Sequence, residues 1–402
     1  MGRLPAAVPG RVPGGADAGC SAPQSPTARL RDAVDSAPVW DTPPIQVRDL
    51  GITIGTGRPG PGNAITDVAG VSVGHATLVR GEDVRTGVTV LFPSVEDPDA
   101  EPVFAGCHRL NGNGELTGLE WIRESGLLTS PVALTNTHSV GVVRNALIAA
   151  RLARGPRSQD AWSLPVVGET WDGFLNDIDG MHVRPEHVVE AIEAARSGPI
   201  EQGSAGGGTG MICHGFKGGI GTASRVLDEA DGGWTVGVLV QANHGRRERL
   251  RIEGVPVGEE LPAAVIPVPG EPWLPRGGSI IVVAATDAPL LPHQCDRLAQ
   301  RAGLGVARTG GAGENSSGDL FLAFATGNRG LAGGRLTLPL EMLAGERIDP
   351  LFYAVIEATE EAIVNAMVAA ETMTGRGGAT AHRLDHDRLR EIMGRYRPRP
   401  GR

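Results

Sequence analysis

Hydrophobic positions along the chain follow two periods, one typical of strands and the other of helices. Short apolar or alternating runs predict strands at 49–55, 71–73, 88–92, 132–135, 234–241, 279–286 and 320–326. Apolar residues at helical spacing predict helices at 142–154, 185–196, 291–301 and 350–371. The two kinds of element are mixed along the whole length, without an internal repeat. We therefore expect an α/β fold in which helices cover stacked sheets.

The ends of the chain differ from its middle. Residues 1–45 are rich in Pro, Gly and Ala and lack periodicity, so we expect a disordered N-terminal tail. Residues 46–378 are expected to form a single catalytic domain, and 379–402 a charged C-terminal tail. The stretch 259–278 contains five prolines and predicts a surface loop. No signal peptide and no apolar run of about 18 residues is visible, which favours a cytoplasmic protein without a membrane partner.

The composition of the chain limits the kinds of partner and cofactor that the protein is expected to bind. A net charge of −9 over 402 residues argues against binding to nucleic acid. The four cysteines lie far apart, which is typical of free thiols in a reducing compartment. Cys107-His108 and Cys213-His214 suggest metal ligands, but adjacent side chains usually point in different directions and no C-x-x-C spacing occurs. We expect neither a metal nor an organic cofactor.

The most specific chemical signal is the hexapeptide Glu314-Asn315-Ser316-Ser317-Gly318-Asp319, which precedes an apolar run. A serine in a flexible, glycine-flanked segment can attack its own preceding carbonyl, and water then hydrolyses the resulting ester. The break frees an α-amine, whose unperturbed pKa of about 7.7–8.0 suits a general base for the hydroxyl of the same residue. The alternative is a plain turn, because Asn, Ser, Gly and Asp are common turn residues.

Several further segments accompany this hexapeptide in a fixed order. They are ITDVAGVSVGH at 65–75, TNT at 135–137, SVG at 139–141, GET at 168–170, DGFLNDI at 172–178, VLVQAN at 238–243 and EATEEAI at 357–363. Together they resemble the DmpA-type family of β-aminopeptidases and L-aminopeptidase/D-esterases. The resemblance implies a four-layer α/β/β/α sandwich, self-cleaved into an α subunit ending at Asn315 and a β subunit beginning at Ser316. It also implies that the two processed chains associate and that several such heterodimers form a homo-oligomer.

The resemblance also assigns roles to single residues. Ser316 is the expected nucleophile, with Ser317 as the competing choice. Thr359 and Glu361 are expected to contact the amine of the nucleophile, although Glu357 and Glu360 lie close enough in sequence to compete. The remaining assignments are an oxyanion donor (Asn243), an acidic residue that meets the amino group of the substrate (Glu169) and two further pocket residues (Asn136 and Asn176). The loop 259–278 looks longer than in relatives and is expected near the pocket mouth.

The expected function is that of an aminopeptidase or amidase, which removes N-terminal residues from short peptides, amides or esters. One alternative is a related self-processing acyltransferase, which usually presents Thr as its nucleophile and is disfavoured by Ser316 and Glu169. Another is an amide hydrolase for pantetheine-like substrates. A third is a non-enzymic ligand-binding protein, which glycine-rich segments such as 203–210 would also fit.

Overall fold

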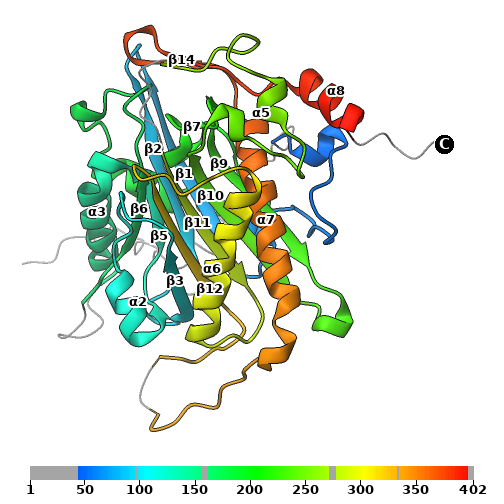
Figure 1. Ribbon diagram of the computed structural model, residues 1–402. Coiled ribbons are helices and arrows are strands. Elements are labelled where there is room, and N and C mark those ends of the chain that lie inside the picture. Colours follow the sequence, from blue (N-terminus) through cyan, green and yellow to red (C-terminus); the bar gives the residue numbers. More distant parts are fainter. Residues whose placement is uncertain (1–43, 96, 156–161, 271–277, 333–334, 397–402) are drawn as a thin grey trace, which may run out of the picture. The chain divides into compact units, whose positions relative to one another are not determined.

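The computed structural model describes residues 44–95, 97–155, 162–270, 278–332 and 335–396 (Figure 1). Residues 1–43, which make up nearly all of the predicted disordered tail, lie outside the described residues. In the described ranges, no helix combines the length and the apolar character needed to cross a bilayer.

Two stacked β-sheets form the centre of the fold. The first has the order β1-β2-β5-β6, with strands Ser72–Arg80, Val84–Phe92, Val132–Asn136 and Val166–Thr170. The second has the order β4-β3-β12-β11-β10-β9, with strands Leu127–Leu128, Val103–Arg109, Gly318–Ala325, Ser279–Thr286, Thr235–Asn243 and Gly219–Val226. Two short hairpins complete the strands, β7 with β8 (Ile212–Cys213 and Phe216–Lys217) and β13 with β14 (Met373–Thr374 and Thr380–Ala381).

Helices cover the outer face of each sheet. The four-stranded sheet packs against α3 (Val140–Ala153) and α4 (Pro185–Glu193), and the six-stranded sheet against α6 (Pro292–Arg308) and α7 (Asp349–Val368) (Figure 1). Separate apolar cores fill the three interfaces; the middle one joins Leu91 of β2 to Leu239, Ile281 and Leu322 of the larger sheet. The smaller helices are α2 (Leu119–Ser125), α5 (Val257–Glu260) and α8 (His386–Tyr396). This arrangement confirms the predicted α/β/β/α sandwich.

Strand β11 shows why the central sheet could be located from the sequence. All eight of its residues are buried, because one face packs on α6 and the other on the first sheet. A strand buried on both faces is continuously apolar, which is the pattern that predicted 279–286. Strand β9 lacks this signal: a Cβ at Gly221 would lie 1.9 Å from the carbonyl oxygen of Ala362, so close packing of α7 requires glycine there.

The predicted strand at 49–55 is wrong. Val47–Leu50 is a turn of 3₁₀ helix, whose Asp49 carboxylate accepts a hydrogen bond from the Gln46 backbone N–H. Val47 and Leu50 are both buried, so their three-residue spacing serves a helical turn. Gly51 ends the turn with a left-handed φ of 77°.

The predicted C-terminal tail is in large part folded. Helix α8 lies within 379–402 and buries Leu389, Ile392 and Met393 against the core that also contains α7. Their spacing of three and four residues places them on one helix face, with the charged side chains elsewhere around the helix. Residues 397–402 lie outside the described residues.

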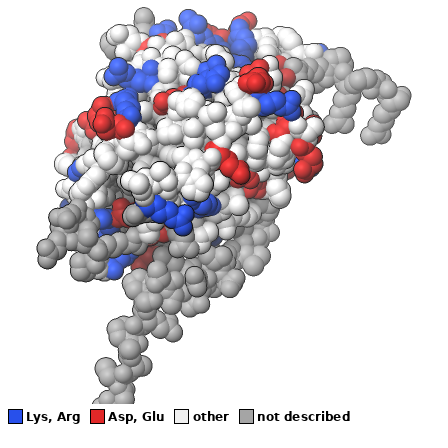
Figure 2. Space-filling view, turned by 90° about the horizontal axis from the view of Figure 1, so that it is seen from below, with Lys and Arg blue, Asp and Glu red and all other residues white. Residues whose placement is uncertain are grey.

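Charged side chains of both signs are interspersed on the face shown in Figure 2. Lys and Arg on this face do not gather into one broad area, and Asp and Glu lie among them. This face therefore presents no extended field of a single sign.

Candidate active site

A cavity of about 900 Å³ lies at one end of the six-stranded sheet, where three strands converge. Asn243 at the end of β10 pairs with Ser279 at the start of β11, and Ser279 pairs in turn with Gly318 of β12. Ser316, two residues before Gly318, therefore reaches the same edge. Asn243, Ser279 and Ser316 all line the cavity, together with Glu169 and Trp171 from the first sheet and the loop after it.

The two adjacent serines have different surroundings. Ser316 is exposed and lines the cavity. Ser317 is buried, and its hydroxyl donates a 2.6 Å hydrogen bond to Asp319 Oδ1. A hydroxyl that is buried and already bonded is poorly placed to attack a substrate, so the geometry favours Ser316.

The segment around Ser316 is held by a loop that the sequence analysis missed. Asn113 Nδ2 donates to the carbonyl oxygen of Ser316 at 2.8 Å, and Asn111 Nδ2 donates to that of Glu314 at 3.2 Å. Asn111 Oδ1 also accepts from the Asp319 backbone N–H at 2.6 Å. These bonds hold the chain on both sides of the Asn315–Ser316 peptide bond. The sequence signal was Asn-Gly-Asn-Gly at 111–114, which reads equally well as an ordinary turn.

Glu169, near the end of β6, places a carboxylate in the cavity wall. Its Oε1 accepts a 3.0 Å hydrogen bond from the Glu115 backbone N–H, and its Oε2 accepts one from the Thr137 hydroxyl. Within the described ranges, no Lys or Arg forms an ion pair with it. Burial raises the pKa of the Glu169 carboxyl above its ordinary value. The carboxylate is thus held in place by two hydrogen bonds, with no ion pair to a described Lys or Arg.

Asn243 is fixed by both ends of its side-chain amide. Its Oδ1 accepts from the Ile212 backbone N–H at 2.8 Å, and its Nδ2 donates to the Trp171 carbonyl oxygen at 2.9 Å. An amide nitrogen carries two hydrogens, so a second donor remains beside the cavity that Asn243 lines. The predicted role of Asn243 as an oxyanion donor needs such a fixed amide, and it stays a prediction.

Asn136 and Asn176 do not line the cavity but share one buried carboxylate. Asn136 Nδ2 donates to Asp172 Oδ2 at 3.1 Å, and Asn176 Nδ2 donates to Asp172 Oδ1 at 3.0 Å. Burial raises the pKa of Asp172 to about 6, against these hydrogen bonds, which favour the ionised form. Trp171 and Phe174 flank Asp172 and line the cavity. The two asparagines therefore hold the loop that forms one wall, and their predicted contact with a substrate stays untested.

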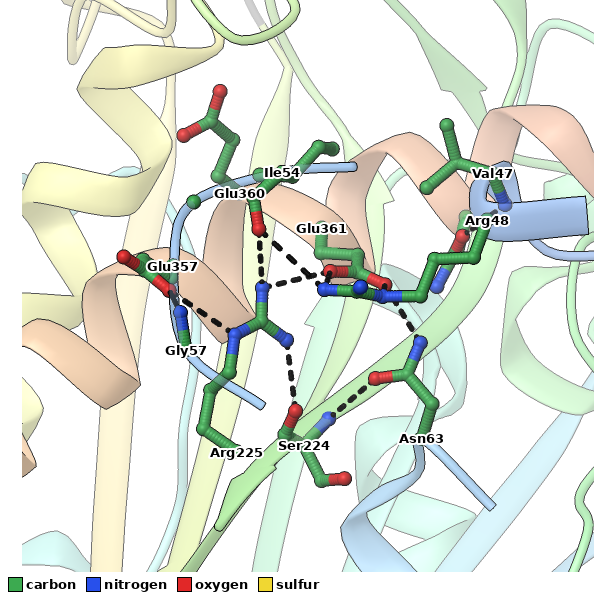
Figure 3. Close-up of polar contacts among 12 residues, drawn as sticks. Val47, Arg48, Ile54, Gly57, Asn63, Ser224, Arg225, Glu357, Glu360 and Glu361 are labelled. Carbon is green, nitrogen blue, oxygen red and sulfur yellow. Dashed lines mark hydrogen bonds and ion pairs between the residues drawn. The ribbon is translucent and has the colours of Figure 1, made fainter. Parts of the chain in front are cut away.

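Thr359 and Glu361 lie on α7, and the structure does not bring them to Ser316. The Thr359 hydroxyl donates to the Val355 carbonyl oxygen one turn earlier in the helix. Glu361 binds Arg225 of β9 at 2.7 Å (Figure 3). Arg225 lies six residues along β9 from its cavity end at Gly219, about 20 Å at the rise of a strand.

The Glu361 carboxylate is instead the centre of a network inside the fold. It accepts hydrogen bonds from Arg48 at 2.6 and 2.8 Å and from Asn63 at 2.6 Å, besides that from Arg225 (Figure 3). Glu357 and Glu360, the alternatives to Glu361, also form ion pairs away from the cavity. Glu357 pairs with Arg225, and Glu360 pairs with Arg308. These carboxylates tie α7 to β9, α6 and the start of the domain.

The proline-rich stretch 259–278 contributes to the cavity at two points. Val268 and Gly278 both line it. Residues 271–277 between them lie outside the described residues.

Comparisons with known proteins agree with this geometry. The family model described as Peptidase family S58 matches residues 63–381. A beta-peptidyl aminopeptidase, BapA, of Sphingosinicella microcystinivorans is 48% identical over 371 residues, covering 88% of this chain and 92% of the relative. A solved Burkholderia sp. beta-aminopeptidase superposes with a TM-score of 0.84 at 55% identity, over 89% of this chain and 100% of that one.

A third relative links the fold to the serine chemistry. The L-aminopeptidase D-Ala-esterase/amidase of Ochrobactrum anthropi superposes with a TM-score of 0.80 at 44% identity, over 87% of this chain and 98% of that chain. Its structure is described as a prototype for the serine aminopeptidases and as a new variant of the Ntn hydrolase fold. With this fold and an exposed serine in the cavity, the chain belongs to peptidase family S58 and is a hydrolase of the serine aminopeptidase type.

Proposed function

We propose that the chain cleaves its own Asn315–Ser316 bond and that Ser316 is then the nucleophile of an aminopeptidase or amidase. The observation that carries this proposal is the contrast between the two serines. Ser316 is exposed in a cavity that also presents Glu169 and Asn243, whereas Ser317 is buried and bonded to Asp319.

The self-cleavage step moves an acyl group from nitrogen to oxygen. Ser316 Oγ attacks the carbonyl carbon of Asn315, the C–N bond breaks as the nitrogen takes up a proton, and an ester remains. Water then hydrolyses this ester, leaving a carboxylate on Asn315 and a free α-amine on Ser316. The hydrogen bonds from Asn111 and Asn113 support this step, because they fix the backbone on each side of the bond that breaks.

Substrate hydrolysis uses the amine that cleavage has released. The α-amine of Ser316 takes the proton from Oγ as Oγ attacks the substrate carbonyl, and Asn243 donates to the oxyanion. The amine then passes the proton to the leaving group, and water hydrolyses the acyl ester. Throughout these steps, Glu169 pairs with the free amino group of the substrate, because it is a buried carboxylate with no ion pair to Lys or Arg among the described residues.

The substrate class follows from this pairing and from the relatives. A cavity of about 900 Å³ with one anionic wall suits a short peptide, amide or ester that has an unblocked N-terminus. The names of the relatives, beta-peptidyl aminopeptidase and L-aminopeptidase D-Ala-esterase/amidase, place β-residues and L-residues among the N-terminal groups to test. We also propose that the processed chains stay associated, that these heterodimers oligomerise, and that the protein acts in the cytoplasm.

The matched variants Ser316→Ala and Ser317→Ala test the assignment of the nucleophile. Turnover of a panel of aminoacyl p-nitroanilides should fall at least about 1000-fold in Ser316→Ala, as expected for loss of a nucleophile. Ser317→Ala should keep most of the turnover of an amide that the wild type accepts. Near-normal turnover by Ser316→Ala would refute the assignment, and loss of turnover in a folded Ser317→Ala alone would transfer it to Ser317.

A further inference from the structure

A second cluster of chemically active side chains lies behind the wall of the cavity. Cys213, His214 and His244 are buried, and each offers one ligand-type atom within 4.8 Å of the other two. Cys213 Sγ lies 3.8 Å from His244 Nδ1, and the two imidazole rings meet edge to face with centroids 5.1 Å apart. The steps proposed for hydrolysis use none of these three side chains.

The backbone explains how two adjacent residues reach one cluster. Side chains of neighbouring residues in a strand point to opposite faces, which was the reason to discount Cys213-His214. Strand β7 ends at Cys213, and His214 has a left-handed φ of 50°, an uncommon conformation for a residue other than glycine. The His214 backbone N–H donates to the His244 carbonyl oxygen at 2.7 Å, which fixes the turn against the end of β10.

Both imidazoles carry a buried nitrogen without a partner. His214 Nδ1 donates to the Arg246 carbonyl oxygen at 3.1 Å, so its Nε2 keeps a lone pair. Neither this atom nor Nε2 of His244 has a hydrogen-bond partner among the described residues. A buried polar atom without a partner is costly, and a backbone carbonyl that orients the other ring nitrogen is typical of a metal-bound histidine.

The nearest arginine does not fill this space. Arg247 donates to the carbonyl oxygens of His214, Gly215, Leu261 and Ile266, and its guanidinium group lies over the Phe216 ring. These contacts hold the arginine side chain in a position of its own, and the cluster keeps one sulfur and two nitrogen donors facing one another.

We propose that Cys213, His214 and His244 bind a zinc ion, with a fourth position for water. Cys thiolate and His imidazole are both zinc ligands, and three protein ligands with an open fourth position are typical of a tetrahedral zinc site that also binds water. The ligand-type atoms lie within 4.8 Å of one another, so they would have to move closer together to reach a Zn–S distance near 2.3 Å and Zn–N distances near 2.0–2.1 Å. His244 borders the cavity, which gives the ion a route of entry.

Zinc binding by the full-length processed enzyme tests this proposal. The protein is stripped with a chelator and dialysed against Zn²⁺ alone, with a non-thiol reductant present. We expect one tightly bound ion per chain, and X-ray absorption at the zinc edge should show one sulfur and two imidazole nitrogens. Failure to bind, or a zinc ion without a sulfur ligand, would overturn the proposal without recourse to any variant.

Matched variants locate the site. Cys213→Ser and His214→Gln should each lower the zinc affinity at least about 100-fold, more than is usual for loss of a supporting residue around a metal. Cys107→Ser is the control, because Cys107-His108 is the same dipeptide within the regular strand β3, and it should leave affinity and stoichiometry unchanged. Unaltered binding by folded Cys213→Ser and His214→Gln, or loss of binding in Cys107→Ser, would refute the assignment.

Discussion

Two buried glutamates show how the same side chain serves two purposes in this fold. Glu361 on α7 is surrounded by Arg48, Arg225 and Asn63, which all bind its carboxylate (Figure 3). Glu169 in the cavity wall accepts hydrogen bonds but forms no ion pair with Lys or Arg in the described part of the chain. The protein supplies cations for the first carboxylate, whereas the second is the one proposed to bind the amino group of the substrate.

This difference separates stability from function. A buried ion pair contributes little net stability, because desolvation offsets the attraction, but removing one partner leaves a buried charge and is strongly destabilising. A buried carboxylate without a paired Lys or Arg is costly to keep ionised, and burial accordingly raises the pKa of Glu169. A bound ligand of opposite charge would stabilise the ionised form of this carboxylate. The two sites should therefore respond to substitution in opposite ways.

The largest effect is expected from Arg225→Met, which removes the cation between Glu357 and Glu361. Glu361 keeps Arg48, but Glu357 loses its paired cation, so the free energy of unfolding should fall by about 3–5 kcal/mol. Urea unfolding measures the change. Arg347→Met, at an exposed pair with Asp231, should cost at most about 1 kcal/mol. If the free energy of unfolding fell equally in the two variants, the buried ion pairs of α7 would stabilise the fold no more than an exposed pair does.

Glu169→Gln should lower the activity without lowering the stability of the fold. Loss of the charge-assisted contact to the substrate should lower kcat/KM for amino-free substrates by about 100-fold, which corresponds to about 2.7 kcal/mol. The free energy of unfolding should stay constant or rise, because a buried charge has been removed. Glu120→Gln on the exposed surface of α2 is the control and should alter neither quantity. If Glu169→Gln lowered the free energy of unfolding but left kcat/KM unchanged, Glu169 would be a stabilising residue and not a substrate-binding one.

The pH dependence of kcat/KM tests whether Glu169 must be ionised to bind the substrate. A carboxyl group with a raised pKa takes up its proton at a higher pH than usual, so the ionised form is lost early as the pH falls. The α-amine of Ser316 already lowers kcat/KM about tenfold per pH unit below its own pKa. Below the pKa of Glu169, the wild type should lose a further tenfold or so per unit. Glu169→Gln should keep the single slope, and two identical profiles would exclude ionised Glu169 from substrate binding.

The smallest effect is expected at Asn136, which supports the wall of the cavity from behind. Asn136→Ala removes the donor to Asp172, so unfolding should become easier by about 1–2 kcal/mol, with a change in kcat/KM of a few-fold at most. Urea unfolding and steady-state kinetics measure the two quantities. A loss of kcat/KM as large as that of Glu169→Gln would mean that Asn136 contacts the substrate.

The sequence predicted the part of the site that lies close to recognisable strand ends. Ser316 was expected from its hexapeptide and Asn243 from the resemblance. Both stand next to apolar runs whose strands pair in the central sheet, and the structure brings them to one cavity. The resemblance also indicated Glu169 correctly as a cavity residue. Whether each residue has the expected role stays a prediction.

The positions of Thr359 and Glu361 could not be inferred from local pattern. Helix α7 is buried almost all round from Leu351 to Val368, so no amphipathic stripe shows which of its side chains face the sheet. The carboxylate of Glu361 is accommodated only because Arg48 and Arg225 come from distant parts of the chain. The cluster at Cys213 was missed for a related reason, since a single left-handed residue reversed the expected side-chain direction.

Intact-mass analysis of purified, catalytically active protein tests the central claim most directly. The account predicts two chains, residues 1–315 and 316–402, with Ser316 at the new N-terminus, and one unbroken chain for Ser316→Ala. An active preparation that contains only the unbroken chain of 402 residues would contradict self-cleavage and the amine-activated serine that depends on it.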